Sequence, residues 1–476
     1  KEVNNMNWTK EQEAILNEIE NGDSHLIINA GAGCAKTTTI VEGAKLIGDK
    51  KAAFMCFNKS IATELSEKLP DGVEASTFHA FGLKAFREAG MKFKINNYKV
   101  KNIISDIMGD DYFSFPLVKL IGLIKGSLLA DDDVRGFRRL IDKHNIELEN
   151  EEVAIENIPY ILEGCRNETY LIDFDDMIWL PIQLDLNIPK YEVLFVDEAQ
   201  DFNECQRELI DRACNGGRCI IVGDRNQAIY GFRGADSDSI SRFQDRLSAK
   251  TRDTKVLTLS TSFRCPTSVV AEANRYVKEF YAMDGASEGK VTTHATFDPN
   301  DGDLVLCRYN APLISAFYSL IGQGKSAYIL GRDMSKGLTS MVNRITKDRK
   351  MSAIGFAEKL DAFVEGEIAR LERQEKLNQI QTLEDKVECL SIFVAKADTV
   401  QQIHDEIKKV FDVSRGKIKL STVHKAKGLE ADNVYILATN RMPHPKGGAE
   451  ENNICYVAIT RAKKNLYYCG DKPSKV

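Results

Sequence analysis

The chain has 476 residues, of which 43% are hydrophobic and 28% charged, and its formal net charge is −6. This length predicts about two to four domains, and the composition excludes global disorder. The sequence contains no run of eighteen apolar residues, and its polar N-terminus lacks an apolar signal stretch. We therefore expect no membrane contact and no secretion, but a cytoplasmic protein of a bacterial or phage-infected cell, or a nuclear protein of a eukaryote.

Strands and helices alternate at the start of the chain. We predict strands at His25–Asn29 and Ala52–Phe57, and helices at Lys36–Ile47 and Ser60–Lys68. This alternation is typical of a parallel sheet with crossover helices. The alternation ends after Phe81, and the 3.6-residue apolar spacing over residues 85–170 predicts mainly helices.

Strands return at Val193–Val196, Arg218–Val222 and Lys255–Leu259, and a second α/β series follows. Its strands are expected at Asp303–Cys307, Ser326–Leu330, Ile418–Thr422, Asn433–Leu437 and Asn465–Cys469. The charged, mostly helical stretch between them is more simply a solvated helix face than a partner-binding coiled coil. The predicted fold class is therefore α/β, with two parallel-sheet cores that each carry a mainly helical insertion.

The eleven cysteines form no CxxC pair, and several fall in segments that are expected to be buried strands. This pattern favours reduced cysteines of an intracellular protein core. We expect neither disulfides nor zinc or iron–sulfur ligands among them.

A turn rich in small residues follows the first strand. It consists of Ala30, Gly31, Ala32, Gly33, Cys34, Ala35, Lys36, Thr37 and Thr38. Backbone N–H groups of such a turn can face a triphosphate, and the following helix directs its positive dipole end at the same anion. We expect ATP here, with Lys36 at the β- and γ-phosphates and the Thr37 hydroxyl on Mg²⁺. The alternative is a glycine-rich turn with a chance Lys-Thr pair.

Ala35 occupies the position before the lysine where this motif normally has glycine. If the position requires a positive φ, alanine costs on the order of 1 kcal/mol or more. If φ is negative, alanine fits without strain. We expect a negative φ, because every other element of the motif is intact.

Two carboxylates, Asp197 and Glu198, follow the apolar strand Val193–Val196. The carboxyl ends of parallel strands line the ligand crevice. We expect Asp197 to hold Mg²⁺, directly or through water, and Glu198 to orient and deprotonate the attacking water. Acidic residues in an ordinary loop are the alternative, which the strand and the upstream turn make less favourable.

Several segments together resemble UvrD/Rep-like superfamily 1A DNA helicases. Val222–Ala235 is similar to motif III, Ser421–Glu430 to motif V and Tyr456–Ala462 to motif VI. In the same order the chain carries likenesses to the Q motif, motif I, motif Ib, an acidic segment and motif II, at Thr9–Gln12, Ala30–Thr37, Thr77–His79, Ile172–Met177 and Asp197–Asp201. Phe57–Ala62 is closer to the F-box DNA helicase branch than to UvrD.

The resemblance implies two RecA-like P-loop motor domains with ATP in the cleft between them. These are domain 1A at residues 1–84 and 171–254, insertion 1B at 85–170, domain 2A at 255–330 and 416–476, and a small insertion 2B at 331–415. The implied activity is that of an ATP-dependent helicase or translocase that moves 3′→5′ on single-stranded DNA. Single-stranded DNA and single-strand/duplex junctions are the expected partners, with single-strand-binding or replication and recombination proteins as further candidates.

Three alternatives remain open on the sequence alone. One is a translocase that removes proteins from DNA with little unwinding, and another is a non-enzymatic nucleotide-binding scaffold, which only Ala35 supports. The third is a superfamily 1 enzyme that moves 5′→3′.

The resemblance also implies roles for single residues. Arg264 and Arg461 match arginine fingers, and Gln227 matches a contact to the γ-phosphate or the attacking water. For the nucleotide, Gln12 would contact the adenine, Phe263 would stack where the family usually has tyrosine, and Glu430 would contact the ribose. The DNA contacts implied are Phe57, Asn58, Lys59, Thr77, His79, Tyr230, Phe232, Thr422 and His424. The alternative for each is an ordinary loop or core residue; for Phe57 we weigh a strand-end core position equally.

Overall fold

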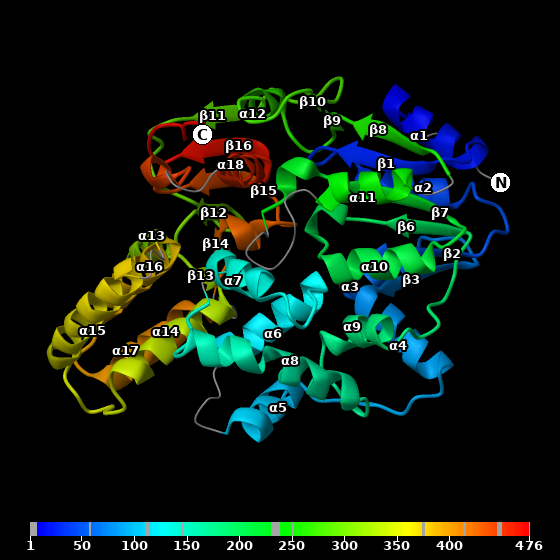
Figure 1. The fold of residues 1–476 in the computed structure, drawn as a ribbon. Coiled ribbons are helices and arrows are strands. Elements are labelled where there is room, and N and C mark those ends of the chain that lie inside the picture. The colour runs from blue at the N-terminus through cyan, green and yellow to red at the C-terminus, as the bar shows by residue number, and fades with distance from the viewer. Residues whose placement is uncertain are drawn as a thin grey trace. The chain divides into compact units, whose positions relative to one another are not determined.

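Two α/β units make up the chain, Lys1–Ser260 and Thr261–Val476. Figure 1 shows a computed structural model of the protein. The structure describes residues 7–56, 59–109, 115–144, 146–229, 239–249, 252–373, 377–412, 416–444 and 450–475. The predicted fold class is confirmed, because each unit is built on a parallel sheet.

The first unit contains a six-stranded sheet in the order β3-β2-β6-β7-β1-β8, in which every pairing is parallel. Its strands are β1 (His25–Ala30), β2 (Ala52–Cys56), β3 (Val73–Thr77), β6 (Val193–Val196), β7 (Arg218–Gly223) and β8 (Thr254–Leu259). Every residue of β2, β6 and β7 is buried. Because successive side chains point to opposite faces, the centre of the sheet is covered on both sides.

The helices of this sheet are α1 (Lys10–Asn21), α2 (Lys36–Ala44), α3 (Lys59–Ser66), α4 (Phe78–Glu88), α9 (Asp176–Gln183), α10 (Glu204–Ala213) and α11 (Ser239–Ser248). Most follow a strand of the sheet, as the alternating sequence pattern predicted. The strand β3 was missed, since its sequence VEAST contains no apolar run and most of it is only half-buried.

One predicted boundary is corrected by the strand β8. The resemblance placed residues 255–259 in domain 2A, but Lys255–Leu259 pairs in parallel with Leu26–Ala30 of β1. The first unit therefore extends to Ser260. The apolar pattern of a buried strand does not specify which sheet the strand joins.

The segment predicted to be helical after residue 85 contains four helices, α5 (Lys99–Met108), α6 (Phe115–Ser127), α7 (Val134–Lys143) and α8 (Glu151–Asn167). Two short strands, β4 (Lys94–Ile95) and β5 (Leu171–Ile172), pair in parallel where the chain leaves and re-enters the sheet region. The helices share one apolar core with the face of the sheet. The insertion is thus packed onto the first unit.

The second unit contains a parallel sheet in the order β11-β16-β15-β12-β14-β13. Its strands are β11 (Lys290–Thr292), β12 (Leu304–Cys307), β13 (Ala327–Leu330), β14 (Ile418–Thr422), β15 (Ala431–Ile436) and β16 (Ala462–Tyr468). Two short strands that pair in parallel, β9 (Thr261–Ser262) and β10 (Tyr281–Ala282), precede this sheet in the chain. The helices are α12 (Thr267–Ala273), α13 (Ala311–Gly322), α14 (Arg332–Ile345), α15 (Ala353–Arg373), α16 (Leu377–Val394), α17 (Val400–Val410) and α18 (Glu450–Ile459).

The charged stretch predicted as a solvated helix face forms most of α15 and α16. These two helices also bury apolar side chains in the core of the second unit, among them Leu360, Leu371, Leu383 and Leu390. Only one face of each helix is therefore left to solvent.

All eleven cysteines are free, and all except the half-buried Cys469 are buried. The donor atoms of His25, Cys214 and Cys219 lie within 4.8 Å of one another. However, the backbone N–H of Cys219 donates to Nδ1 of His25 (3.0 Å), and three donors are fewer than the four of a structural zinc site. The trio matches a core histidine packed against two thiols. Within the described ranges, no helix has both the length and the apolar content to cross a membrane.

Candidate nucleotide-binding site

The turn between β1 and α2 forms a small cradle at the carboxyl edge of the first sheet. The backbone N–H of Gly31 donates to the carbonyl of Leu259 (2.9 Å), which ties the turn to β8. Ala35 occupies the N-cap of α2 and has no side-chain oxygen. It cannot supply the cap that Ser, Thr, Asp or Asn usually provides, and a bound phosphate would fill that role for the N–H groups of the first turn.

The expected negative φ at Ala35 is wrong. The residue is left-handed, with φ 54° and ψ 36°. The chain must turn from β1 into the axis of α2 at this point, and the left-handed conformation makes that turn where related motifs use glycine. Glu198, on the other side of the site, is left-handed as well, with φ 56° and ψ 38°. Two strained non-glycine residues therefore flank one site, as is common at functional sites.

Four predicted residues converge at this edge. The Thr37 hydroxyl donates to Oδ2 of Asp197 (2.8 Å), although 160 positions separate the two residues. Nζ of Lys36 lies 3.7 Å from Oε1 of Glu198. The backbone N–H of Glu198 donates to Oδ1 of Asp197 (2.7 Å), which fixes the two carboxylates relative to each other.

The charges of the site favour a bound cation. Burial, and next the neighbouring Glu198, raise the pKa of Asp197 to about 6, while Lys36 acts in the opposite direction. Burial alone would lower the pKa of Lys36, but Glu198, Asp224 and Asp197 outweigh it and raise that pKa above its ordinary value. One ammonium thus faces three carboxylates. A divalent ion bound to Thr37 and Asp197 would favour the ionised form of Asp197.

A chain of polar contacts runs from Glu198 along the edge of the sheet. The side-chain amide of Gln200 donates to Glu198, and its oxygen accepts from the backbone N–H of Asp224 (3.0 Å). Nε2 of Gln227 donates to Oδ2 of Asp224 (2.7 Å). The predicted Gln227 is therefore linked to Glu198 through Gln200 and Asp224, which were not among the predicted residues. Asp224 had a usable signal, since like Asp197 it directly follows a buried strand.

Gln12 has a structural role in α1. Its side chain accepts from the backbone N–H of Thr9 (3.0 Å) in a capping box, and its Nε2 donates to the Thr39 hydroxyl of α2 (3.1 Å). Gln12 is 2% exposed. The structure therefore places it beside the helix of the cradle, with its amide bonded to protein partners.

Some predicted DNA contacts lie at the ends of β2 and β3. Lys59 is exposed at the start of α3, and Thr77 is the N-cap of α4, where its hydroxyl accepts from the Ala80 N–H (3.2 Å). His79 is half-buried in the first turn of α4. Phe57, Asn58, Tyr230 and Phe232 lie outside the described residues.

Three predicted residues from motifs that are distant in sequence lie close together in the second unit. Nε of Arg264 lies 2.7 Å from Oε2 of Glu430, and its NH1 donates to the Thr460 carbonyl (3.5 Å). Arg461 is 1% exposed, and its guanidinium donates to the carbonyls of Val457 (2.9 Å) and Leu429 (3.3 Å). Arg264 is thus held by a carboxylate at the surface, whereas Arg461 is buried in its own unit.

The other predicted residues of this unit lie next to Arg264 in the chain or at the end of β14. Phe263 precedes Arg264 and is 41% exposed. Thr422 ends β14, and the half-buried His424 follows in the short helix Val423–Ala426.

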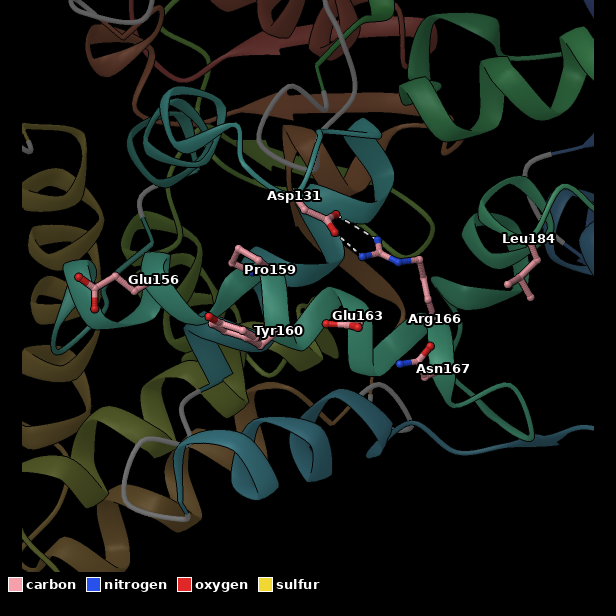
Figure 2. Close-up of a pocket in the computed structure, with 8 residues that line it drawn as sticks. All are labelled: Asp131, Glu156, Pro159, Tyr160, Glu163, Arg166, Asn167 and Leu184. Carbon is pink, nitrogen blue, oxygen red and sulfur yellow. Dashed lines mark hydrogen bonds and ion pairs between the residues drawn. The ribbon is translucent and has the colours of Figure 1, made fainter.

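A separate hollow of about 610 Å³ lies on the helical insertion (Figure 2). Its lining is Asp131, Glu156, Pro159, Tyr160, Glu163, Arg166, Asn167 and Leu184. The guanidinium of Arg166 pairs with Asp131, with NH1 3.0 Å from Oδ1, and the lining includes two further carboxylates, those of Glu156 and Glu163. This lining repels rather than attracts a triphosphate, so the hollow is not the nucleotide site.

A small-residue turn between strand and helix, with an acidic pair after β6, which β7 separates from β1 in the same sheet, defines a P-loop protein. Comparison with family models is more specific. Residues 8–248 match the UvrD/REP helicase N-terminal domain, and residues 320–470 match the UvrD-like helicase C-terminal domain. The chain belongs to the UvrD/Rep helicase family.

Curated relatives agree with this assignment. The chain is 25% identical to F-box DNA helicase protein 1 of Schizosaccharomyces pombe, over 98% of this chain and 58% of the relative. It is 26% identical to F-box DNA helicase 1 of Gallus gallus, over 96% and 48%. It is 27% identical to ATP-dependent DNA helicase PcrA of Staphylococcus epidermidis, over 58% and 40%. The matches thus span about half the length of these relatives.

Replacing Ala35 with glycine is expected to stabilise the first unit. Alanine in the left-handed region is strained by about 1–2 kcal/mol, while glycine loses ~0.5–1 kcal/mol more conformational freedom on folding. The net gain is at most about 1.5 kcal/mol, measured as the free energy of unfolding in denaturant. Ala62→Gly within the helix α3 is the matched control and should lose about 1 kcal/mol. Equal losses in both variants would contradict the strain argument.

Proposed function

We propose that the chain binds ATP and Mg²⁺ and uses ATP hydrolysis to move along single-stranded DNA as a helicase. The observation that carries the proposal is the convergence of Lys36, Thr37, Asp197 and Glu198 at one edge of the first sheet. These are the residue types that phosphoryl transfer to water requires: a phosphate-binding ammonium, two metal-binding oxygens and a base.

In this proposal the first unit supplies the hydrolytic groups. The backbone of the turn 31–35 and Lys36 bind the phosphates, and Thr37 and Asp197 hold Mg²⁺, which when bound neutralises phosphate charge. Glu198 orients the water and accepts its proton as the water oxygen bonds to the γ-phosphorus. The bond from that phosphorus to the β–γ bridging oxygen breaks, and ADP leaves with the electron pair. The amide of Gln200 holds Glu198 in position.

The second unit would supply the arginine fingers. Arg264 pairs with Glu430, and Arg461 bonds to the adjoining carbonyl of Leu429, so both arginines belong to one group of residues. A γ-phosphate in reach of Arg264 would compete with Glu430 for its guanidinium. Glu430 could then contact the ribose, with Phe263 stacking on the adenine and Gln12 contacting its edge. Dependence of hydrolysis on groups from both units would couple ATP state to domain position.

The DNA would contact the proposed motor domains 1A (1–84 and 171–260) and 2A (261–330 and 416–476). Lys59, Thr77 and His79 are the described candidates in the first, and Thr422 and His424 in the second. Phe57, Asn58, Tyr230 and Phe232 stay sequence predictions. The helical segments 85–170 and 331–415 would be the insertions 1B and 2B, and single-strand/duplex junctions would be the substrate for unwinding.

The purified protein is expected to hydrolyse ATP with Mg²⁺, at a rate that single-stranded oligonucleotide increases. Lys36→Ala should abolish this hydrolysis, because the ammonium that faces the phosphates is lost. Lys45→Ala is the matched control, since Lys45 caps the other end of α2 and pairs with Glu42. The rate of phosphate release is measured for the wild type and for both variants. A wild-type protein that does not hydrolyse ATP, or one that Lys36→Ala leaves unchanged, would favour the scaffold alternative.

Arg264→Ala is expected to reduce kcat about 10³-fold or more with little change in ATP affinity, because the finger acts on charge that develops during transfer. Arg252→Ala is the control: its guanidinium pairs with Asp23 in the first unit. Steady-state hydrolysis and nucleotide-binding titration separate the two quantities. Equal loss of binding and turnover would argue against the finger role.

The proposed direction is 3′→5′, which family membership supports and local chemistry does not address. Translocation should therefore change a dye signal at the 5′ end of a single strand and leave a 3′-end dye unaffected. The reverse result would contradict the direction. Two assays on the same DNA, one of strand separation and one of removal of a DNA-bound protein, distinguish the two candidate functions. A helicase separates the strands, whereas the alternative translocase removes the protein with little unwinding.

A further inference from the structure

The backbone beside the proposed base, Glu198, is held by a residue outside the segments that resemble family motifs. Glu198 is left-handed, and the short helix Ala199–Asp201 follows it directly. The hydroxyl of Ser239 donates to the carbonyl oxygen of Ala199 (2.7 Å), although 40 positions separate the two residues. Ser239 is the first residue of α11 and is fully buried. The chain that leaves the base is therefore tied to the start of α11.

The buried Arg207 of α10 sets the direction of this hydroxyl group. Its NH1 donates to Oγ of Ser239 (3.1 Å) and to the carbonyl oxygen of Phe202 (2.9 Å). A guanidinium only donates, so the hydroxyl accepts from Arg207 and directs its own proton to Ala199. Nε and NH2 of Arg207 both donate to Oε2 of Glu204, at 3.2 and 2.8 Å. The guanidinium is thus fixed between its own helix and the chain after the acidic pair.

The next residue of α11, Ile240, packs against the same edge of the sheet. A Cβ atom on Gly223, the last residue of β7, would lie 2.9 Å from Cδ1 of Ile240 and 2.6 Å from Oε1 of Gln200. The three residues are therefore in close contact, and Gln200 is the residue whose amide donates to Glu198. The start of α11 thus supports both the backbone and the side chain of the proposed base.

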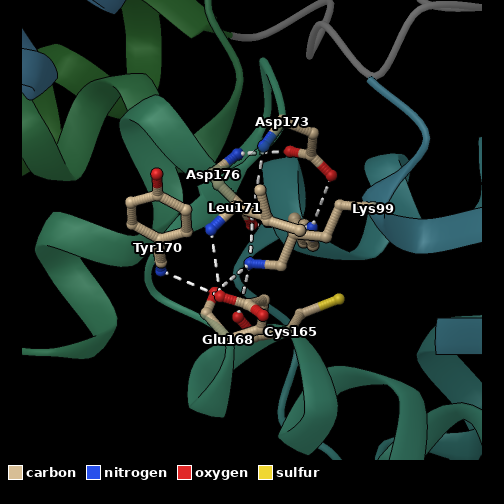
Figure 3. A network of polar contacts seen from close by, with 8 residues as sticks. Lys99, Cys165, Glu168, Tyr170, Leu171, Asp173 and Asp176 are labelled. Carbon is tan, nitrogen blue, oxygen red and sulfur yellow. Dashed lines mark hydrogen bonds and ion pairs between the residues drawn. The ribbon is translucent and has the colours of Figure 1, made fainter. Parts of the chain in front are cut away.

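The helix that carries Arg207 rests on the helical insertion. A Cβ atom on Gly126 of α6 would lie 2.9 Å from Nδ2 of Asn203, the N-cap of α10. Nζ of Lys125, also on α6, donates to Oδ1 of Asp176 (2.8 Å), and Nζ of Lys99 on α5 donates to Oδ2 of the same carboxylate (2.6 Å; Figure 3). All three charged side chains are buried. Arg207 therefore acts from a helix whose start is packed against a fixed neighbour.

We propose that Ser239 and Arg207 are positioning residues for hydrolysis, which hold Glu198 through the Ala199 carbonyl where it can accept the proton of the attacking water. The inference rests on the proposed function and adds two residues to it. A base must lie within hydrogen-bond reach of the proton that it accepts, so a small displacement of Glu198 lowers the rate. Since neither residue contacts the nucleotide in this proposal, their loss should slow hydrolysis and leave nucleotide binding unchanged.

The test compares kcat with nucleotide affinity in the full-length chain. Phosphate release is measured at saturating ATP, Mg²⁺ and single-stranded oligonucleotide, and affinity is measured by titration with a fluorescent ATP analogue. Ser239→Ala should lower kcat about two- to tenfold, the effect of one hydrogen bond, and bind nucleotide as the wild type does. Arg207→Met, which loses the donors to Ser239 and Phe202, should lower kcat at least as much.

A second readout separates positioning from a general effect on the fold. In Glu198→Gln there is no base to position, so adding Ser239→Ala should cause no further fall in the single-turnover rate of hydrolysis. Ser241→Ala is the matched control, because Ser241 is half-buried two residues further along α11. It should hydrolyse ATP at the wild-type rate. Thermal unfolding of each variant monitors the fold, and Ser239→Ala decides the test if Arg207→Met does not fold.

Three results would overturn the proposal: a wild-type kcat in Ser239→Ala, an equal loss of kcat and nucleotide affinity, or a further fall in the Glu198→Gln background as large as that in the wild type. A wild-type rate in Glu198→Gln alone would instead contradict the proposed function, because it would remove the base that Ser239 positions.

Discussion

The parallel ladder that joins β1, β7 and β6 is the constraint on which the nucleotide site depends. Asn29 pairs with Gly223, and Val196 pairs with Ile221, so the three strands end at the same edge of the sheet. The turn to α2, the acidic pair and the Asp224 segment must therefore meet there. A one-residue slip of register would turn every side chain of a strand to the other face, and buried strands do not tolerate it.

Two of the left-handed non-glycine residues among those that the structure describes lie at the edge that would bind an anion. Ala35 and Glu198 both have a left-handed backbone conformation, which costs about 1–2 kcal/mol for each residue. Hydrogen bonds hold the surrounding chain in place: Gly31, at the start of the turn that leads to Ala35, donates to the carbonyl of Leu259, and the N–H of Glu198 donates to the side chain of Asp197. The stability of the large buried sheet offsets strain at these two positions, and the strain orients the groups that would face phosphate and water.

Buried charge connects the helical insertion to the same edge. Burial alone would lower the pKa of Lys125, but the effects of Cys165, Asp176 and Asp173 exceed it and raise that pKa. The lysine therefore remains charged in the core. Removing one partner of such a group typically costs about 3–5 kcal/mol, because the other charge is left buried and unpaired. The network thus fixes α5 and α6 to the turn between β5 and α9, so the insertion helps to shape the sheet edge.

The amino-acid pattern alone was sufficient for the fold class, most central strands and the helical character of the two segments that interrupt them, because buried strands have a distinctive apolar run. It also pointed to Lys36, Thr37, Asp197 and Glu198, which the structure brings together, because phosphate turns have a distinctive composition. It assigned β8 to the wrong domain, because an apolar run does not specify which sheet a strand joins, and it missed the half-buried strand β3. The sign of φ at Ala35, the links through Gln200 and Asp224, the pairing of Arg264 with Glu430 and the bond between Ser239 and Ala199 came only from the folded chain. The φ of Ala35 is set by how the chain enters α2, and the other contacts join residues far apart in sequence whose distance is set by packing.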